Sequence, residues 1–221
     1  MIKVERIEVW GFEHAIRGMR NPLNSWDRSD TFLGTEYHGV DENGKEVSCK
    51  PDLIIGENDL ALMKKLYDAG QPHRKYLRQI FVSMDITAPL YWWKQFDTYR
   101  VGVTTNSCST MHKIQAKEFT REDFSCEHLD LSYPLKCLDQ TIHVLNIKRE
   151  EFLETKDKQH WWNMVQLLPS SYNQKRTVTM SYENVMNIMD YRQAHKLDEW
   201  NDFCEILAGL PVIEELRGKG K

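Results

Sequence analysis

The clearest pattern of apolar and polar positions runs from Phe81 to Ala88, where every second residue is apolar. The apolar members are Val82, Met84, Ile86 and Ala88. A period of two predicts a strand with one buried face. Pro89 follows, and because it lacks a backbone N–H it suits the first turn of a helix. We therefore predict a strand over 81–88 and a helix over 89–100, with Gly102 as its end.

Two other segments show the spacing of amphipathic helices. In the segment 58–67 the apolar residues recur at helical spacing, which predicts a helix with Asn58 as N-cap and Gly70 as its end. A second stripe predicts one long helix over 184–207. Its members are Val185, Met189, Arg192, Lys196, Trp200, Phe203 and Leu207.

Two cations, Arg192 and Lys196, interrupt the apolar stripe of this second helix. A buried guanidinium needs a partner, because an unpaired charge in the interior costs several kcal/mol. One interpretation is that Lys196 extends to solvent and Arg192 pairs with an acid such as Asp190 of a neighbouring subunit. The other is that Arg192 binds a phosphate, which its planar fork suits. The pattern alone leaves both interpretations open.

The segment Val103–Thr110 is unusually rich in hydroxyl and amide side chains. Such a loop after a helix can bind a phosphate through side-chain and backbone donors. It can equally be a turn whose Ser, Thr and Asn side chains satisfy their own backbone. The chain contains neither GxxxxGK[ST] nor GxGxxG, so the common nucleotide-binding fingerprints are missing.

Turn signals and chain ends set the expected organisation. Asp41–Gly44 is a strong turn signal, so residues 34–45 are expected to form a hairpin or loop. The residues after Leu216 offer little to bury, so 216–221 are expected to be a flexible tail. No repeat or low-complexity linker divides the chain. We therefore expect one domain over 1–221.

Composition narrows the function classes. The 221 residues are 41% hydrophobic and 28% charged, as in ordinary globular proteins. A net charge of −4 argues against a nucleic-acid partner, and the apolar runs are too short for a membrane span, so a cytoplasmic location is expected. The five cysteines form no CxxC pair and the eight histidines no HExxH motif, so no metal site is expected.

With these elements in place, the chain resembles the flavin-dependent thymidylate synthases, usually called ThyX. That family has an F-x-I-x-A-P strand and helix, then Q-x-x-R-H-R, then N-E-x-S-x-R-Y. Here Ile86–Pro89 and Gln95 match the first two parts, and Thr98–Arg100 occupy the R-H-R positions. With one residue inserted, Asn106–His112 occupies the third part, where Asn106 and Ser109 match.

The C-terminal half resembles the family more closely. The family has an L-P pair and then a helix of the form N-x-x-x-x-R-x-x-x-H. Leu168–Pro169 match the pair, Asn187 and Arg192 match the helix, and His195 or Lys196 stands near the histidine position. The resemblance covers residues 55–207 and leaves 1–50 unassigned.

The resemblance implies an α+β fold of ThyX type, with a mixed sheet packed against the helices 89–100 and 184–207. It implies a homotetramer that binds FAD and a uridine nucleotide at subunit interfaces. Arg192 would contact the nucleotide and activate its ring. The implied nucleotide-binding residues are Gln95, Arg100, Ser109 and Arg192, and the implied cofactor-binding residues are Asn106, Asn187, His195 and Lys196.

The family methylates deoxyuridylate to thymidylate, using NADPH and methylene-tetrahydrofolate. Here Thr98, Ser107 and Met111 replace two arginines and a glutamate, and Val165 replaces an arginine before the L-P pair. Each lost charged contact costs about 1.5–3 kcal/mol, which implies weak or absent turnover or a different ligand. Four cations could compensate, namely Arg74, Lys94, Lys113 and Arg176.

Three functions therefore remain in view. The first is a divergent thymidylate synthase, and the second is a protein that binds a uridine nucleotide without turnover. The third is a catalytically inactive scaffold whose paired tryptophans, Trp92–Trp93 and Trp161–Trp162, contact partners. NADPH and the folate are implied only for the first.

Overall fold

The computed structural model describes residues 2–34, 37–40, 46–49 and 53–218. The chain gathers into two compact units. One, the sheet unit, comprises Met1–Val9, Val82–Met180 and Asn184–Leu207, and the other, the helical unit, comprises Trp10–Phe81, Ser181–Glu183 and Ala208–Lys221. The single domain over 1–221 stays a prediction.

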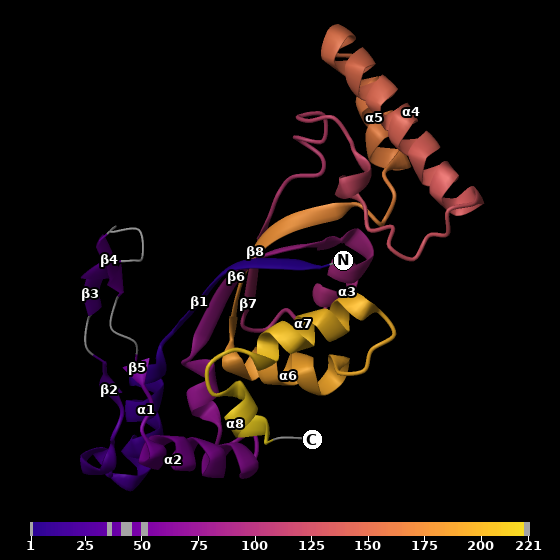
Figure 1. Ribbon diagram of the computed structural model, residues 1–221. Helices are drawn as coiled ribbons and strands as arrows, with labels where there is room; N and C mark the ends of the chain where they lie inside the picture. Colours follow the sequence, from indigo (N-terminus) through magenta and orange to yellow (C-terminus); the bar gives the residue numbers. More distant parts are fainter. Residues whose placement is uncertain (1, 35–36, 41–45, 50–52, 219–221) are drawn as a thin grey trace. The chain divides into compact units, whose positions relative to one another are not determined.

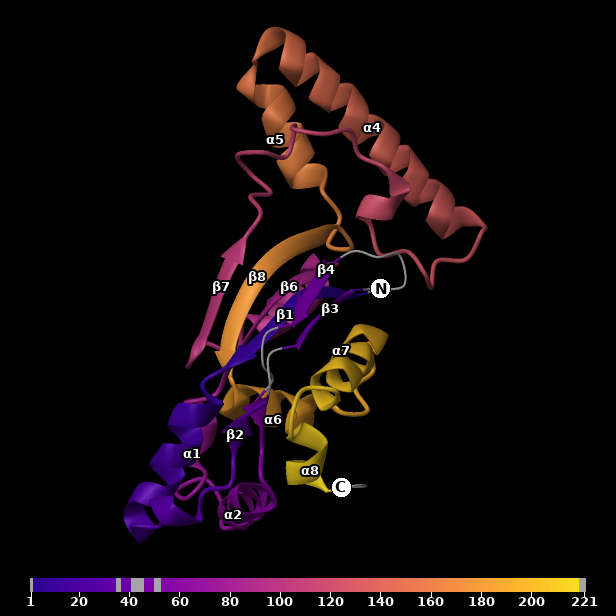
Figure 2. The same ribbon diagram turned by 60° about the vertical axis from the view of Figure 1, so that its left-hand side comes forward.

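Four strands form the main sheet, in the order β1-β6-β8-β7. Their bounds are β1 Lys3–Trp10, β6 Phe81–Pro89, β7 Val103–Ser107 and β8 Asn173–Ser181. A hydrogen bond between the hydroxyls of Ser83 and Thr179 (3.0 Å) and one from Thr177 to Asp85 (2.7 Å) join β6 and β8 side by side (Figure 2). The predicted strand over 81–88 is confirmed.

The predicted hydroxyl-rich loop is wrong over most of its length, because residues 103–107 form strand β7. This strand pairs antiparallel with β8, with Asn106 opposite Thr177 and Ser107 opposite Arg176. Threonine is a good strand former, and Val103–Ser107 lies at the edge of the sheet, where polar side chains are tolerated. The backbone groups of β7 that face β8 are engaged in the ladder, so the segment is not the open loop that a phosphate-binding turn would need.

Helix α3, Leu90–Phe96, follows β6 directly, with Pro89 as its N-cap. It ends four residues before the predicted Arg100. The Thr98 hydroxyl donates to the carbonyl of Gln95 (2.8 Å), and the chain then turns at Gly102 with φ 73°. A side chain that takes a helix carbonyl competes with the next helical turn, which explains the early end.

The predicted long helix over 184–207 is two helices, α6 Tyr182–Arg192 and α7 Asp198–Ala208 (Figure 1). Ala194 has φ 60° and breaks the helix. The apolar part of the stripe is confirmed, since its five members are buried: Val185, Met189, Trp200, Phe203 and Leu207. Arg192 is half-buried at the end of α6, whereas Lys196 is exposed in the break.

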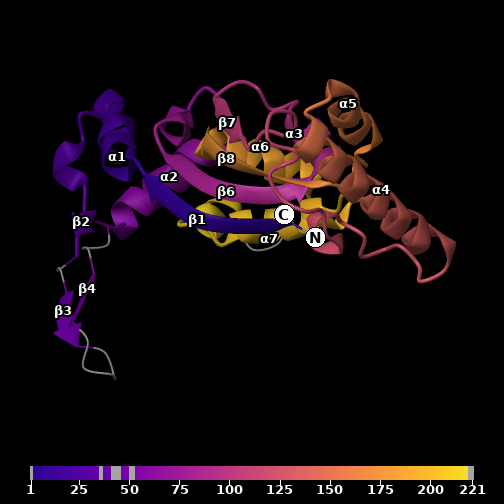
Figure 3. The same cartoon turned by 90° about the horizontal axis from the view of Figure 1, so that it is seen from above.

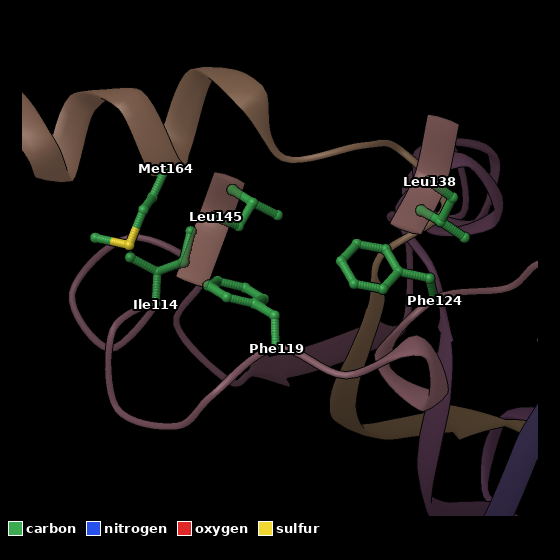
Figure 4. Packing of buried hydrophobic residues seen from close by; sticks show 6 residues of the cluster. All are labelled: Ile114, Phe119, Phe124, Leu138, Leu145 and Met164. Atoms are coloured by element: carbon green, nitrogen blue, oxygen red, sulfur yellow. The ribbon is translucent and has the colours of Figure 1, made fainter. Parts of the chain in front are cut away.

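A helical hairpin in the sheet unit carries a second, smaller core. Helices α4 Tyr133–Thr155 and α5 Lys158–Leu167 lie side by side (Figure 3). Figure 4 shows Leu138 beside Phe124, and Leu145 with Met164 close to two residues of the preceding loop. The six buried side chains are Ile114, Phe119, Phe124, Leu138, Leu145 and Met164. This cluster fixes the loop after β7 against the hairpin.

The helical unit contains short elements. They are α1 Phe12–Arg20, η1 Asn21–Leu23, η2 Trp26–Arg28, β2 Phe32–Leu33, β3 Tyr37–Val40, β4 Glu46–Cys49, β5 Leu53–Ile54, α2 Glu57–Asp68, η3 Lys75–Arg78 and α8 Ile213–Arg217, while η4 Arg121–Asp123 belongs to the sheet unit. Strand β3 pairs antiparallel with β4, as a hairpin requires. The predicted turn Asp41–Gly44 lies outside the described residues.

A buried ion pair connects α1 to α2. The Arg20 Nε donates to Asp59 Oδ1 at 2.6 Å, and both side chains are almost inaccessible. Burial alone would raise the pKa of Asp59, but hydrogen bonds from Thr31, Ser29 and Arg20 outweigh it and lower the pKa. The carboxylate is therefore held in its charged form.

Helix α2 is confirmed, but Asn58 is not its N-cap. The cap position is Gly56, and the side chain of Asp30, remote in sequence, accepts from the backbone N–H of Asn58 (2.9 Å) and Asp59 (3.1 Å). A Cβ on Gly56 would lie 2.1 Å from Asp30 Cγ, so only glycine allows this approach. Gly70, with φ 91°, follows the helix as predicted.

The expected flexible tail begins too early in the sequence prediction. Leu216 is buried and lies within α8, which continues to Arg217. The buried side chain of Leu216 holds this part of the chain in place, and the sequence pattern did not show that it would be buried. Residues 219–221 lie outside the described part of the chain.

Candidate functional site

The Arg192 guanidinium lies among neutral acceptors at the end of α6. Its Nε donates to the Tyr99 hydroxyl at 2.9 Å, and its Nη1 donates to Gln95 Oε1 at 3.2 Å. Both partners come from the α3 segment, Gln95 from the helix and Tyr99 from the turn after it. The early end of α3 thus places Tyr99 within reach of Arg192.

Aromatic rings form the other side of this site. The Arg192 guanidinium carbon lies 4.5 Å from the centre of the Trp200 ring and 5.5 Å from that of Tyr99. Trp200 Nε1 donates to the same Gln95 oxygen at 2.9 Å. Cation–π contact with a desolvated tryptophan contributes about 1–2 kcal/mol. We name this group, Gln95, Tyr99, Arg192, His195 and Trp200, the Arg192 cluster.

Arg192 forms no ion pair within the described part of the chain. Its neighbours are a hydroxyl, an amide oxygen, an imidazole and two rings. A half-buried cation that meets only neutral partners among the described residues favours an anionic or strongly polar ligand. The pairing with Asp190 of a neighbouring subunit stays an untested alternative.

A packed aromatic layer supports the cluster from behind. Trp92 lies 4.6 Å from Trp200 and 5.1 Å from Phe96, centre to centre, and all three side chains are fully buried. The Tyr91 hydroxyl donates to Glu199, which ties the start of α3 to the start of α7. Burial first, and then the Glu199 carboxylate, raise the pKa of Tyr91, so its phenol stays protonated.

Of the residues predicted from the resemblance, Gln95, Arg192 and His195 meet in the cluster. The others lie elsewhere in the described structure. Arg100 is exposed and donates to the carbonyl of Asp97, and Ser109 accepts from the backbone of its own turn. Asn106 is exposed on β7 and Lys196 is exposed in the break. Asn187 is half-buried in α6. Their predicted roles stay predictions.

Sequence reasoning missed Tyr99 and Trp200 as members of the site. Tyr99 stands where the family has a histidine, and Trp200 reads as one more apolar residue of the stripe. The usable signal was the Trp200 indole, because a buried indole N–H needs an acceptor and Gln95 supplies it.

The replaced family positions have local roles. Thr98 ends α3, the Met111 carbonyl accepts from Trp161 Nε1 (2.8 Å), and Val165 packs against the small core of the hairpin. Two of the possible compensating cations are committed elsewhere: Arg176 pairs with Asp97 at 2.6 Å and lies over Trp93, and Arg74 approaches Glu183 at 4.0 Å. Lys94 and Lys113 are exposed.

The end of the hydroxyl-rich segment lines a cleft of about 280 Å³, with Cys108 and Thr110 among its residues. Its two lysines are paired with carboxylates, Lys117 with Asp123 and Lys175 with Asp85. Paired cations leave little charge for a phosphate, so this cleft is the weaker anion site.

The described residues show neither a metal-ligand cluster nor a membrane-spanning helix. Over the described ranges, no three His, Cys, Asp or Glu side chains gather as metal ligands would. Within the same part of the chain, no helix combines the length and apolar character that crossing a bilayer demands.

Comparison with known proteins gives matches in structure only. No family model and no curated protein matches the sequence. Two solved structures of thymidylate synthase X from Helicobacter pylori, both with FAD and dUMP, superpose with a TM-score of 0.66 at 15% identity. The first covers 93% of this chain and 91% of that chain, and the second covers 97% of each.

The chain has the ThyX fold. The fold class predicted from the strand and proline at 81–89 and the segment 184–200 is therefore confirmed. A UMP/dUMP methylase, PolB from Streptomyces cacaoi, bound with 5-Br dUMP, superposes with a TM-score of 0.59 at 15% identity, covering 98% of this chain and 94% of that one. The solved structures that match this chain therefore include both a thymidylate synthase and a UMP/dUMP methylase.

Proposed function

We propose that this protein binds a uridine monophosphate nucleotide through the Arg192 cluster. The observation that carries the proposal is the half-buried Arg192, held by Tyr99 and Gln95 over Trp200, with no acid of the described chain beside it. Structures of the same fold hold dUMP or its bromo analogue, which supports the choice of ligand.

The chemistry of the cluster suits such a ligand. A guanidinium presents parallel N–H groups that match phosphate and carbonyl oxygens. The Tyr99 hydroxyl accepts from that guanidinium and the centre of the Trp200 ring lies 4.5 Å from its carbon, so its position is set before binding and little side-chain entropy is lost. Charge drawn from the pyrimidine by Arg192 would activate its ring.

We also propose that FAD binds, with Asn106, Asn187 and Lys196 as its contacts. His195, the fourth cofactor residue implied by the resemblance, lies in the Arg192 cluster, with its Nε2 3.4 Å from Arg192 Nη1. The exposed side chains of Asn106 and Lys196 fit an anionic cofactor, because neither has a hydrogen bond or ion pair within the described residues. Bound FAD, once reduced by a donor such as NADPH, would supply hydride to the nucleotide. FAD and dUMP occur together in the matched H. pylori structures, which supports this assignment.

Thymidylate synthesis is expected to be weak or absent. Thr98, Ser107 and Met111 place no charge where the family has two arginines and a glutamate. Arg176 and Arg74, two possible substitutes, already face carboxylates. A ligand therefore meets fewer cations here, and the inactive scaffold is the alternative function if no nucleotide binds. NADPH and methylene-tetrahydrofolate matter only if turnover occurs.

A homotetramer with sites shared between subunits belongs to the same proposal, carried by the resemblance to the family. Light scattering at micromolar protein concentration tests it. A monodisperse monomer would exclude any mechanism in which two subunits share a ligand.

The deciding experiment is calorimetric titration of the protein with dUMP and with UMP, together with a flavin absorbance spectrum. Binding of either nucleotide is expected, and no heat with either ligand would refute the proposal. Tritium release from labelled dUMP, with FAD, NADPH and methylene-tetrahydrofolate supplied, measures turnover. Release at the rate of an ordinary thymidylate synthase would show that the lost charges are compensated.

A further inference from the structure

His195 lies in the break between α6 and α7, where a backbone N–H determines which ring nitrogen carries the proton of the neutral imidazole. The Leu197 N–H donates to His195 Nδ1 at 3.1 Å. A nitrogen that accepts a hydrogen bond carries no proton, so the neutral ring holds its proton on Nε2. Asn201 Nδ2 donates to the His195 carbonyl at 3.0 Å and holds the same segment in place.

The protonated side of the ring faces another donor. His195 Nε2 lies 3.4 Å from Arg192 Nη1. Arg192 can only donate, and in this tautomer Nε2 can only donate as well. The pair therefore does not form a good hydrogen bond between its members, and both N–H groups can turn to a common acceptor.

The Gln95 amide also has only a donor left for a ligand. Its oxygen accepts from both Arg192 Nη1 and Trp200 Nε1, and neither of those groups can accept. The amide rotamer is thereby fixed with its NH₂ group turned away from both. That NH₂ has no hydrogen-bond partner in the described part of the chain. The unused hydrogen-bonding capacity of Gln95, Arg192 and His195 thus consists of donors.

We propose that His195 is a specificity-determining residue that donates its Nε2–H, beside Arg192, to an oxygen acceptor of the ligand. This inference rests on the proposed function, since it concerns the same cluster. The recognised group is an oxygen without hydrogen, which is either a phosphate oxygen or a pyrimidine carbonyl. A ligand that presents an N–H donor at that point is rejected, because donor would meet donor.

Two substitutions separate this role from a structural one. His195→Asn places an amide oxygen near Nδ1, so it keeps the contact with Leu197 but loses the distal donor. His195→Gln places an amide NH₂ near Nε2, so it keeps the donor but loses the contact with Leu197.

The two substitutions should affect binding and stability in opposite ways. His195→Asn should keep the melting temperature and weaken dUMP binding about three- to tenfold. His195→Gln should melt lower and bind dUMP within about twofold of the wild type. Calorimetric titration and thermal melting measure both. If dUMP affinity follows melting temperature in the two variants, His195 is structural and the inference is wrong.

Probe ligands identify the oxygen. If the acceptor is the pyrimidine 4-oxygen, dCMP, which carries an amine there, should bind far more weakly than dUMP. If the acceptor is a phosphate oxygen, dCMP should bind like dUMP, and deoxyuridine should bind far more weakly.

Long-range ¹H–¹⁵N spectra of histidine-labelled protein read the tautomer directly. A His195 ring with its proton on Nδ1 would overturn the inference whatever the affinities are. A wild type that binds no dUMP would instead refute the proposed function and, with it, the ligand role of His195.

Discussion

At the scale of the residue, Arg192 matters because, among the described residues, its charge is held by neutral groups only. Tyr99 and Gln95 accept from it, and Trp200 lies beneath it. These contacts orient the guanidinium but do not neutralise it. A ligand anion would therefore meet a cation that is already in place and still has donors to give.

Replacing Arg192 by alanine should weaken dUMP binding by about 1.5–3 kcal/mol, the range for a charged hydrogen bond. Arg192→Lys should recover only part of this, because an ammonium cannot form a two-pronged contact. The control Lys136→Ala removes an exposed charge from α4 and should leave affinity unchanged.

Thermal melting separates binding from folding in the same variants. Loss of the contact with Trp200 should cost stability by about 0.5–2 kcal/mol. A much larger loss, in a protein whose wild type binds no nucleotide, would mean that Arg192 serves the fold alone.

Arg192 could be predicted from the sequence, because a cation in an apolar stripe needs a partner. Its partners could not. Tyr99 reaches it only because Thr98 ends α3 early, and that hydrogen bond to Gln95 leaves no periodic trace in the sequence. Threonine hydroxyls can compete locally for helix carbonyls, but the residue type alone does not show where they do.

At the scale of the element, the start of α2 depends on a side chain from outside the helix. Asp30 accepts from the N–H groups of Asn58 and Asp59, which an N-cap side chain would normally do. The sequence suggested Asn58 as the N-cap because it lies at the start of the helix. Asp30 is remote in sequence, so the pattern around the helix gives no sign of it.

Asp30→Ala should therefore lower the free energy of unfolding by about 1 kcal/mol, within the range of about 0.5–2 kcal/mol for a lost cap. Urea titration followed by circular dichroism measures it. Asn58→Ala is the matched control, since the exposed Asn58 side chain is not the cap. Equal losses in the two variants would contradict the assignment of Asp30.

The break between α6 and α7 is the element that the sequence hides best. Residues 193–197 contain neither glycine nor proline, and Ala194 is a strong helix former. Yet Ala194 takes φ 60°, and the side chains of His195 and Asn201 bind backbone groups of the break. These local side-chain hydrogen bonds outweigh a difference in helix propensity of less than about 1 kcal/mol per residue.

At the scale of the whole molecule, the strand β6 and helix α3 could be predicted because Phe81–Pro89 keeps its period of two. The first 50 residues could not be assigned. In β1 the residue Arg6 has φ 53°, which interrupts the alternation that marks a strand. The rest of that segment forms short helices and strands. Their positions depend on contacts between residues far apart in sequence, such as that of Arg20 with Asp59.

That ion pair predicts acid sensitivity. Because folding lowers the pKa of Asp59, its contribution to stability is complete above the unfolded pKa of about 3.9 and is lost as the pH falls further toward the folded pKa. The free energy of unfolding should therefore decline below about pH 4. Denaturant titrations between neutral and acid pH measure the decline.

Carboxyl ¹³C spectra can assign this decline to one residue. Asp59 should titrate below the ordinary range for aspartate. Titration at or above about 3.9 would show that the hydrogen bonds from Arg20, Ser29 and Thr31 do not stabilise the charged form.

The hydrogen bond from the Leu197 amide to the His195 ring has a consequence for exchange with solvent. This amide is protected by an imidazole nitrogen instead of a carbonyl, so its deuterium uptake reports the state of one side chain. When a ligand engages the opposite nitrogen of the ring, the ring is held more firmly and uptake at Leu197 should slow. Deuterium uptake at the Leu197 amide would therefore report whether a ligand occupies the site beside His195, without any added probe.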